Sequence, residues 1–515
     1  MPVSEKKIQK IDSYGNVEIF EGFPYNFYEL KAEPFSVQEL EIAKALIGTI
    51  NRHLSVSELK RQLKAEQELI EEFNSQIIQS IELSQLIDKF PSSIQWSELS
   101  KSLSSLLKKN FPSVKNSDDL AEYVLGNSIG FKKLHSLLSD SRLEEVMVNG
   151  FDRNVFVFHR KSGLCKTNIA IEKKMLENIL GKIASTVGKK FNEENPLLDA
   201  RLPDGSRANA TFSNVSAFGH TLTVRKFSRT PMSIIEMIER KTVSSELAAF
   251  LWLMVEGLNI EPMNIIVTGG TGSGKTSFMN SLASFIRYSD RIISIEDTQE
   301  TDLGGRENWI PLESRLKIGT GEEVSMNDLL KNALRMRPDR IIVGEVRGEE
   351  AQTLFTAMDT GHRGILGTLH SNTAKEMLTR LKSAPMHVPE PVIPLLNLSV
   401  VMVKMYDRER GVIRRIKEVA ELASMEDKVL LSNIFEWGRK SDSIQQTDVP
   451  SHLLDVLAEH TDYSKKELKN EILVRQRILE WMLESGIKSS SEVDSTIQQY
   501  YLNPLSVIEK ASKGL

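Results

Sequence analysis

Helical and strand-like hydrophobic patterns alternate through the second half of the chain. Short apolar runs of the strand type are separated by longer segments in which apolar residues recur every three or four positions. The predicted order is helix 244–256, strand 264–268, helix 275–286, strand 291–296, helix 326–336, strand 340–344, helix 348–359, strand 364–369 and helix 373–382. This alternation predicts an α/β fold in which a parallel sheet is flanked by helices.

The residues before this region carry a different pattern. Short strands are predicted at 143–149, 155–158 and 222–224, with a helix over 171–189 between them. This is an α+β arrangement. Pro231 interrupts any strand in the polar connection 228–233, and Ser233 with Glu236 fits a capping box that opens the next helix.

Both ends of the chain contain helical patterns. Over 54–90, apolar residues recur at helical spacing at Val56, Leu59, Leu63, Ile70, Phe73, Ile77 and Ile81. A helix packed on its own domain is the ordinary interpretation, and a partner-binding helix is the alternative. The tail 450–515 is also predicted to be mostly helical. The predicted organisation is a partly helical extension (1–117), an α+β domain (118–227), a linker (228–233), an α/β domain (234–440) and a mostly helical tail (441–515).

Composition narrows the classes of protein that remain. The 515 residues predict two or three domains, and the net charge of −5 gives no electrostatic reason to expect a nucleic-acid partner. Cys165 is the only cysteine, which excludes an internal disulfide and a cysteine-clustered zinc site and indicates a reducing compartment. The apolar stretch 391–405 contains Asn397 and Lys404, so no membrane span is predicted, and the first residues lack the apolar core of a signal peptide.

Residues 269–276 complete the phosphate-binding pattern G-x-x-x-x-G-K-[ST] between a predicted strand and a predicted helix. Glycines let such a loop curl so that backbone N–H groups point at one anion, and the helix N-terminus adds positive potential. Lys275 is expected to reach the β- and γ-phosphates, and the Thr276 hydroxyl is expected to bind Mg²⁺. The pattern predicts an ATP–Mg²⁺ site whose contacts are Gly269, Gly270, Thr271, Gly272, Ser273, Gly274, Lys275, Thr276 and Ser277.

Acidic residues follow two later strands. Glu296 and Glu300 come at the end of strand 291–296, and Glu345 follows strand 340–344. Because ligands of a doubly wound sheet lie beyond the carboxyl ends of its strands, these carboxylates are expected to face the phosphates. One would hold Mg²⁺ or its waters, and another would orient and deprotonate the attacking water. Solvated surface carboxylates are the alternative. The predicted metal contacts are Thr276, Glu345 and Glu296.

His370 lies at the end of a third predicted strand, within the segment GTLHSN at 367–372. A histidine there could donate a hydrogen bond to a γ-phosphate and report its presence. A structural histidine is the ordinary alternative.

Four ordered motifs together resemble the secretion-type ATPase superfamily, whose members drive type II and type IV secretion, type IV pili and the archaeal flagellum. The phosphate loop is similar to the family's Walker A motif, IEDTQE at 295–300 to its Asp box, RPDRIIVGEVRG at 337–348 to its Walker B segment, and GTLHSN to its His box. The resemblance covers about 118–440 and implies a RecA-like P-loop NTPase domain that follows an α+β, PAS-like domain and a largely helical extension.

The resemblance also implies roles for individual residues. Glu300 matches the glutamate that activates water, Glu345 the Walker B glutamate, and His370 the γ-phosphate sensor. LPDGSRANA at 202–210 and LTVRKF at 222–227 match segments of the family's N-terminal domain that supply arginines to the nucleotide, which places Arg207 and Arg225 in that role. The alternative for each arginine is a structural salt bridge.

The resemblance further implies a homohexamer that works at the cytoplasmic face of the membrane with a polytopic platform protein, and indirectly with pilin-like subunits. The four-cysteine zinc element found in many type II members is excluded here. VRKFS and the segment 407–422 are most similar to the archaeal flagellum and pilus motors. The alternatives are a DNA-transport motor of type IV secretion, a pilus retraction motor, and a nucleotide-dependent scaffold that binds ATP but hydrolyses it poorly.

Overall fold

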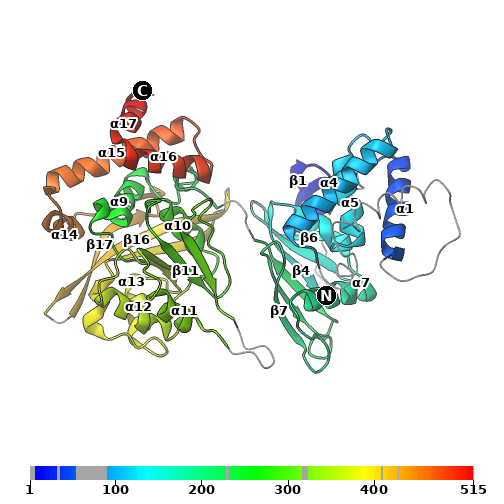
Figure 1. The fold of residues 1–515 in the computed structure, drawn as a ribbon, viewed down its shortest axis with the longest axis horizontal. Coiled ribbons are helices and arrows are strands. Elements are labelled where there is room, and N and C mark those ends of the chain that lie inside the picture. Colours follow the sequence, from blue (N-terminus) through cyan, green and yellow to red (C-terminus); the bar gives the residue numbers. More distant parts are fainter. Residues whose placement is uncertain are drawn as a thin grey trace. The chain divides into compact units, whose positions relative to one another are not determined.

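The computed structural model divides the chain into two compact units, Met1–Ser228 and Arg229–Leu515. The structure describes residues 6–31, 35–53, 90–227, 231–315, 323–407, 410–426 and 428–513 (Figure 1). Each unit contains one nine-stranded sheet. The predicted amphipathic helix over 54–90 falls almost entirely on residues 54–89, which lie outside the described residues. The predicted domain boundaries at 117, 227, 233 and 440 stay predictions.

The N-terminal unit is built on a mostly antiparallel sheet in the order β1-β2-β3-β6-β5-β4-β9-β8-β7. Only the β3–β6 pairing is parallel. The three strands nearest the N-terminus therefore continue the sheet of the predicted α+β domain. The strands are β1 (Lys6–Tyr14), β2 (Val17–Phe23), β3 (Asn26–Leu30), β4 (Leu143–Asn149), β5 (Asn154–His159), β6 (Gly163–Ala170), β7 (Leu197–Arg201), β8 (Arg207–Thr211) and β9 (Thr221–Arg225).

Helices cover this sheet and form a second small core beside it. Helix α7 buries Leu176, Ile179, Leu180 and Ile183, one helical face, against the sheet core. Helices α1, α4 and α5 pack their apolar sides on one another. The helices are α1 (Val37–His53), α4 (Ser93–Asn110), α5 (Ser117–Ser128), η1 (Lys132–Leu134), α6 (His135–Ser139) and α7 (Lys173–Thr186).

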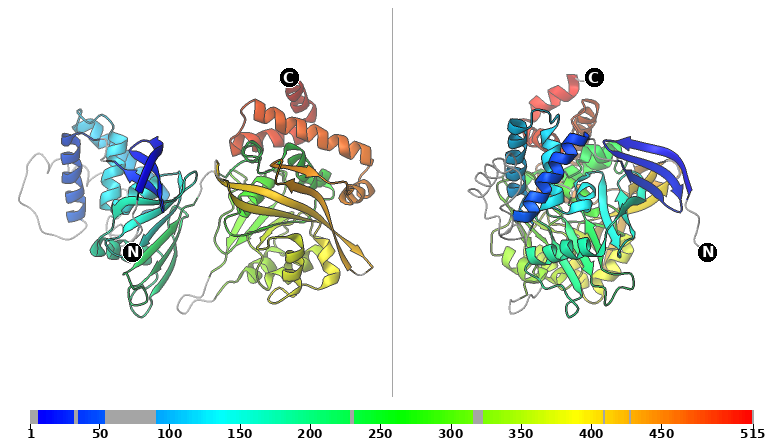
Figure 2. Two further views of the ribbon diagram at one scale, coloured as in Figure 1. Left: turned by 180° about the vertical axis from the view of Figure 1, so that it is seen from behind. Right: turned by 90° about the vertical axis from the view of Figure 1, so that its right-hand side faces the viewer.

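The C-terminal unit has a sheet in the order β12-β11-β13-β14-β10-β15-β16-β17-β18. The strands from β12 to β15 are parallel, as the alternation in the sequence predicts. Figure 2 shows the antiparallel strands β16 and β17 as long ribbons that extend this sheet. The strands are β10 (Ile265–Gly269), β11 (Ile292–Glu296), β12 (Trp309–Glu313), β13 (Arg340–Val343), β14 (Leu366–Leu369), β15 (Leu398–Asp407), β16 (Gly411–Met425), β17 (Lys428–Gly438) and β18 (Ser443–Gln446).

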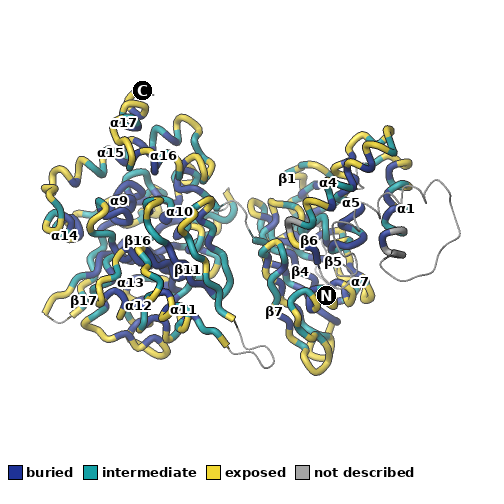
Figure 3. Tube along the Cα trace, viewed as in Figure 1, coloured by how far each residue is buried: buried dark blue, intermediate teal, exposed yellow. Residues whose placement is uncertain are grey.

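Successive side chains of each parallel strand point to opposite faces, and each face has its own helical cover. Ile265 and Val267 belong to a core shared with α9 and α10, whereas Ile266 belongs to one shared with α11 and α12. The strands beneath these helices are almost entirely buried (Figure 3). The helices are α8 (Ile234–Glu239), α9 (Ser245–Glu256), η2 (Gly257–Asn259), α10 (Lys275–Ala283), α11 (Met326–Ala333), α12 (Glu350–Asp359), α13 (Ala374–Lys382) and η3 (Glu390–Leu395).

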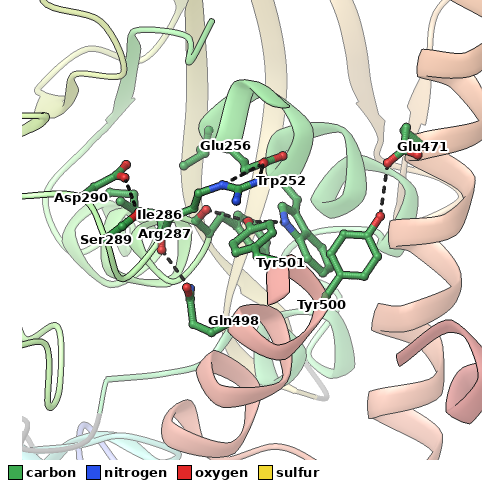
Figure 4. Close-up of polar contacts among 12 residues, drawn as sticks. Trp252, Glu256, Ile286, Arg287, Ser289, Asp290, Glu471, Gln498, Tyr500 and Tyr501 are labelled. Carbon is green, nitrogen blue, oxygen red and sulfur yellow. Dashed lines mark hydrogen bonds and ion pairs between the residues drawn. The ribbon is translucent and has the colours of Figure 1, made fainter. Parts of the chain in front are cut away.

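The chain ends in a helical tail, as predicted. Its helices are α14 (Leu453–His460), α15 (Lys465–Glu484), α16 (Ser490–Leu502) and α17 (Pro504–Lys513). Helix α15 packs along α9, and all four tail helices contribute side chains to the core that contains α9. Figure 4 shows the polar part of this contact, where side chains of α15 and α16 meet the end of α9 and the segment after α10. The predicted capping box of Ser233 and Glu236 is present at the start of α8.

One feature of this unit differs from expectation. The prediction contains no strand at the residues of β12 or of β15 to β18. In β16 the charged run RRIKE hides the alternation. None of the helices in the described ranges is long and apolar enough to cross a membrane.

Candidate nucleotide site

The phosphate loop joins the buried strand β10 to helix α10, which begins at Lys275. Gly274 precedes that helix with φ of 94°, a left-handed conformation that glycine adopts without strain. A Cβ at Gly269 would lie 2.4 Å from the Met402 carbonyl oxygen and 2.5 Å from Ser273 Oγ, so only glycine fits there. The loop is therefore held tightly against the strand beside it.

Lys275 points back across the loop. Its side chain is buried, and its Nζ donates to the carbonyl oxygens of Gly269 (3.1 Å) and Gly270 (3.2 Å). Within the described part of the chain, Ser273 Oγ is buried and has no hydrogen-bond partner. Thr276 and Ser277 occupy the first turn of α10. A curled backbone, an ammonium group and an unpaired hydroxyl at a helix N-terminus fit a phosphate chain.

His370 and Glu345 lie beside Lys275. The Lys275 Nζ is 3.4 Å from His370 Nε2 and 3.5 Å from Nδ1. His370 Nε2 is in turn 3.7 Å from Glu345 Oε1. Burial first, and then the Lys275 charge, lower the pKa of His370, while Glu345 opposes this shift. A neutral imidazole has one donor and one acceptor nitrogen, so it can donate to a phosphate oxygen without carrying charge.

Glu296 and Glu300 are linked through the backbone. The Glu296 carboxylate is buried at the end of β11 and accepts from the N–H of Glu300 (3.1 Å) and of Thr301 (3.1 Å). Burial raises the pKa of Glu296 to about 6. Asn280 of α10 donates to the Glu300 carbonyl oxygen (3.3 Å). Glu296 thus fixes the turn that carries Glu300, and its role as a metal contact stays a prediction.

Parallel strand order explains why these residues meet. The strands β10, β11, β13 and β14 are neighbours in one sheet and run in one direction, so their carboxyl ends share an edge. The phosphate loop, Glu296, Glu345 and His370 each follow one of these ends. The edge is the place where open α/β sheets bind ligands.

The described residues fit an Mg²⁺ ion that is held by few protein groups together with the phosphates of a nucleotide. They include no group of three or more histidine, cysteine, aspartate or glutamate side chains that could hold a metal ion. Mg²⁺ is commonly held by one or two carboxylates or hydroxyls together with substrate phosphates. Thr276 and Glu345 fit that mode, because Thr276 lies in the first turn of the helix after the loop and Glu345 lies beside the Lys275–His370 pair.

Arg207 and Arg225 belong to the N-terminal unit, whereas the phosphate loop belongs to the C-terminal unit. The two arginines are partners across β8 and β9, and Arg201 on β7 is the partner of Arg207. On its other side, Arg225 has Glu145 of β4 as its cross-strand neighbour. The structure therefore brings three arginines into one row across the sheet. Their predicted contact with the nucleotide stays a prediction.

Two basic residues near the loop, Lys404 of β15 and Arg414 of β16, are not among the predicted site residues. Arg414 Nε donates to the Gly272 carbonyl oxygen at 3.0 Å. A Cβ at Gly272 would lie 3.4 Å from Lys404 Nζ. No motif signals either residue, because their proximity to the loop depends on the pairing of β15 with β10 and of β16 with β15.

The RecA-like parallel sheet, with its phosphate loop and carboxyl-end acidic residues, defines a P-loop NTPase fold. The chain belongs to the type II/IV secretion system protein family, whose model matches residues 129–405. The family predicted from the four motifs is thereby confirmed.

Relatives with sequence similarity come from archaea and bacteria. The chain is 50% identical over 231 residues to the uncharacterised protein MJ0781 of Methanocaldococcus jannaschii, a match that covers 44% of this chain and 32% of that relative. It is 34% identical over 395 residues to the uncharacterised protein MJ0900 of the same organism, covering 75% of this chain and 69% of that one. It is 29% identical over 302 residues to the conjugal transfer protein TrbB of Rhizobium radiobacter, covering 58% and 89%.

Among solved structures, the VirB11 ATPase from the Brucella suis type IV secretion system is similar to this chain. The identity is 25%, the TM-score is 0.29, and the match covers 58% of this chain and 94% of that chain.

Proposed function

We propose that this chain hydrolyses ATP with Mg²⁺ at the phosphate loop 269–276. The observation that carries the proposal is the contact of Lys275 with His370, and of His370 with Glu345, at one edge of the sheet. A glycine-rich turn with a chance Lys-Thr sequence would not require these neighbours. Family membership over 129–405 supports the same conclusion.

Each residue has a chemical task in this proposal. The loop N–H groups and Lys275 bind and orient the phosphates, and Thr276 and Glu345 hold Mg²⁺, which supplies charge neutralisation when bound. Glu300 orients the attacking water and accepts its proton, in the position fixed by Glu296. His370, whose pKa is lowered by burial and by Lys275, donates to the γ-phosphate.

The proposed biological role is a homohexameric motor at the cytoplasmic face of the membrane. It powers assembly or secretion of type IV pilin-like subunits, of an archaeal flagellum or pilus, through a polytopic membrane protein. The type II/IV secretion family supports the class of machine, and the similarity to two Methanocaldococcus jannaschii proteins supports an archaeal-type member.

Steady-state ATP turnover of the wild-type chain, Lys275→Ala and Glu300→Gln tests the enzyme. Wild type should turn over, and each variant should lose about 10²-fold or more, because a phosphate ligand or the water-activating group is removed. Lys331→Ala on α11 is the matched lysine control and should keep wild-type turnover. Equal background rates for all four chains would overturn hydrolysis and leave a nucleotide-binding scaffold.

The similarity to the conjugal transfer protein TrbB favours one second candidate, a motor for DNA transport. A DNA motor needs a basic, aromatic-bearing surface for single strands, and its turnover depends on DNA. Stimulation of turnover by single-stranded DNA, lost at high salt, would favour this candidate. Turnover indifferent to DNA favours filament assembly.

A further inference from the structure

The hairpin of β15 and β16 presents two cations to the phosphate loop. Strand β15 runs parallel to β10, with Met402 beside Gly269, so its next residues pass alongside the loop. Lys404 stands there, and the antiparallel register makes Arg414 its direct cross-strand partner. Directly opposed residues share a face, so both side chains lie on the same side of the hairpin.

Arg414 is bonded to the loop at Gly272 and leaves little room for a side chain at Gly274. Its Nε donates to the Gly272 carbonyl oxygen (3.0 Å). Its Cδ lies 3.1 Å from the position that a Cβ on Gly274 would take. Gly272 and Gly274 both have left-handed backbone conformations, with φ of 72° and 94°. The guanidinium therefore holds the stretch of loop that must stay curled for its N–H groups to converge on an anion.

The next residue of β16, Arg415, contacts the body of the unit and not the loop. Arg415 is buried, pairs with Asp442, and donates to the Arg240 carbonyl oxygen. It therefore anchors the hairpin to the body of the unit. Because Arg415 already anchors the hairpin, we assign the bond from Arg414 to Gly272 to the shape of the phosphate loop.

We propose that Arg414 is a positioning residue of the nucleotide site, which holds the phosphate loop in its anion-binding shape, and that Lys404 beside it adds positive charge that attracts the phosphate chain. The inference rests on the proposed function in that the ligand is ATP or ADP. A hydrogen bond from a charged donor is stronger than one between neutral groups. Because this bond shapes the loop, its loss should weaken the binding of any nucleotide that has a β-phosphate. It does not touch Glu300, Glu345 or His370, so the chemical step should be spared.

The test compares ADP affinity and ATP kinetics in the full chain for wild type, Arg414→Met, Arg414→Lys and Lys404→Met. Arg414→Met should weaken ADP binding and raise KM for ATP about tenfold, with kcat within about twofold, because one charge-assisted hydrogen bond to the loop is lost. Arg414→Lys, which keeps a cationic donor, should recover part of the affinity. Lys404→Met should weaken ADP binding a few-fold at low salt and less at high salt.

Arg410→Met is the matched control. Arg410 lies on the same hairpin but pairs with Asp407 and Asp442, away from the loop, so its loss should leave ADP affinity unchanged. Unchanged ADP affinity in Arg414→Met overturns the proposal, and so does a fall in kcat at constant KM. If Arg414→Met does not fold, Arg414→Lys and Lys404→Met decide together. The proposal is overturned if Arg414→Lys has the wild-type ADP affinity and the wild-type KM, and Lys404→Met has the wild-type salt dependence of ADP binding. A wild-type chain that binds ADP without turnover contradicts hydrolysis, while the affinity comparison still judges Arg414.

Discussion

Glu296 lies buried at the end of β11, where its carboxylate accepts hydrogen bonds from two successive backbone N–H groups. These bonds shape the turn that carries Glu300. Burial disfavours the charged form and raises the pKa of Glu296 from 4.5 to about 6. Glu296 therefore supports the turn of its neighbour Glu300, and its contact with metal stays a prediction.

The raised pKa makes a prediction about stability. A carboxyl group whose folded-state pKa is raised stabilises the fold fully below pH 4.5, and this contribution is lost as the pH rises through about 6. The loss corresponds to about 2 kcal/mol. Glu296→Gln cannot ionise, so its free energy of unfolding relative to wild type should rise by that amount between pH 4.5 and 7.5.

Urea unfolding of the C-terminal unit at both pH values measures this difference. The exposed Glu307, on the loop after β11, supplies the control substitution Glu307→Gln, whose difference from wild type should stay constant. A difference for Glu296→Gln that is also independent of pH would contradict the assignment of a raised pKa.

The nucleotide site shows how far single residues can be predicted. Lys275 and the loop glycines follow from a motif, because the chemistry of phosphate binding fixes their order and spacing. The prediction that Glu300, Glu345 and His370 lie near the phosphate loop follows from strand order, because the carboxyl ends of parallel strands share an edge. Arg414 has no such signal, because its contact with Gly272 depends on the register of an antiparallel hairpin.

At the scale of elements, the tail helix α16 holds the end of the helix that starts at the phosphate loop. Tyr501 donates to the Phe285 carbonyl oxygen (2.8 Å) and Gln498 to that of Ile286 (2.9 Å), just after α10 ends (Figure 4). The tail also approaches α9, where Glu256 accepts from Arg287 and from Arg475 of α15 (3.0 Å). The tail therefore packs as one body with α9 and with the end of the phosphate-loop helix α10.

The buried pair of Glu256 and Arg475 carries an element-scale prediction. Both side chains are almost completely buried, with exposures of 1% and 2%. Glu256→Leu removes the acceptor of two arginines and leaves Arg475 buried with Glu471 alone. The free energy of unfolding should fall by about 3–5 kcal/mol, as expected when one partner of a buried ion pair is removed.

The exposed pair of Lys488 with Glu239 is the matched control, because it likewise joins the tail to the body of the unit, there at the end of α8. Glu239→Leu should cost at most about 1 kcal/mol, which is the range of exposed pairs. Denaturant unfolding of both variants makes the comparison. Equal losses would show that burial of the Glu256–Arg475 pair has no special weight.

At the scale of the whole molecule, the two units contribute different kinds of groups. The C-terminal unit contains the loop and the acidic residues, while the N-terminal unit presents the row of Arg201, Arg207 and Arg225 on neighbouring strands. Arginine is suited to neutralise charge that builds on a transferred phosphoryl group. If the arginines have the predicted role, hydrolysis needs groups from both units.

This division predicts a kinetic signature. Arg207→Ala and Arg225→Ala should each lower ATP turnover by about 10³-fold, the lower end of the effect of arginines on phosphoryl transfer. ADP affinity should stay within a few-fold of wild type, because the loop lies in the other unit. Turnover and ADP binding of the full chain measure both effects.

Arg160→Ala serves as the control, because Arg160 is an exposed arginine of the same unit that donates to the Ser141 carbonyl oxygen instead. It should keep wild-type turnover. Full turnover in both Arg207→Ala and Arg225→Ala would rule out the proposed role of these residues and leave them as parts of salt bridges.

The sequence by itself determined the type and order of the main elements. Alternating patterns predicted the parallel strands and helices from α9 to α13, and the motifs indicated the family, because local spacing reports both periodicity and phosphate chemistry. Tertiary structure alone decided which distant segments meet: β1–β3 joining the N-terminal sheet, the tail packing on α9, and Arg414 reaching the phosphate loop. Such contacts depend on strand pairing and burial between remote residues, which no local pattern records.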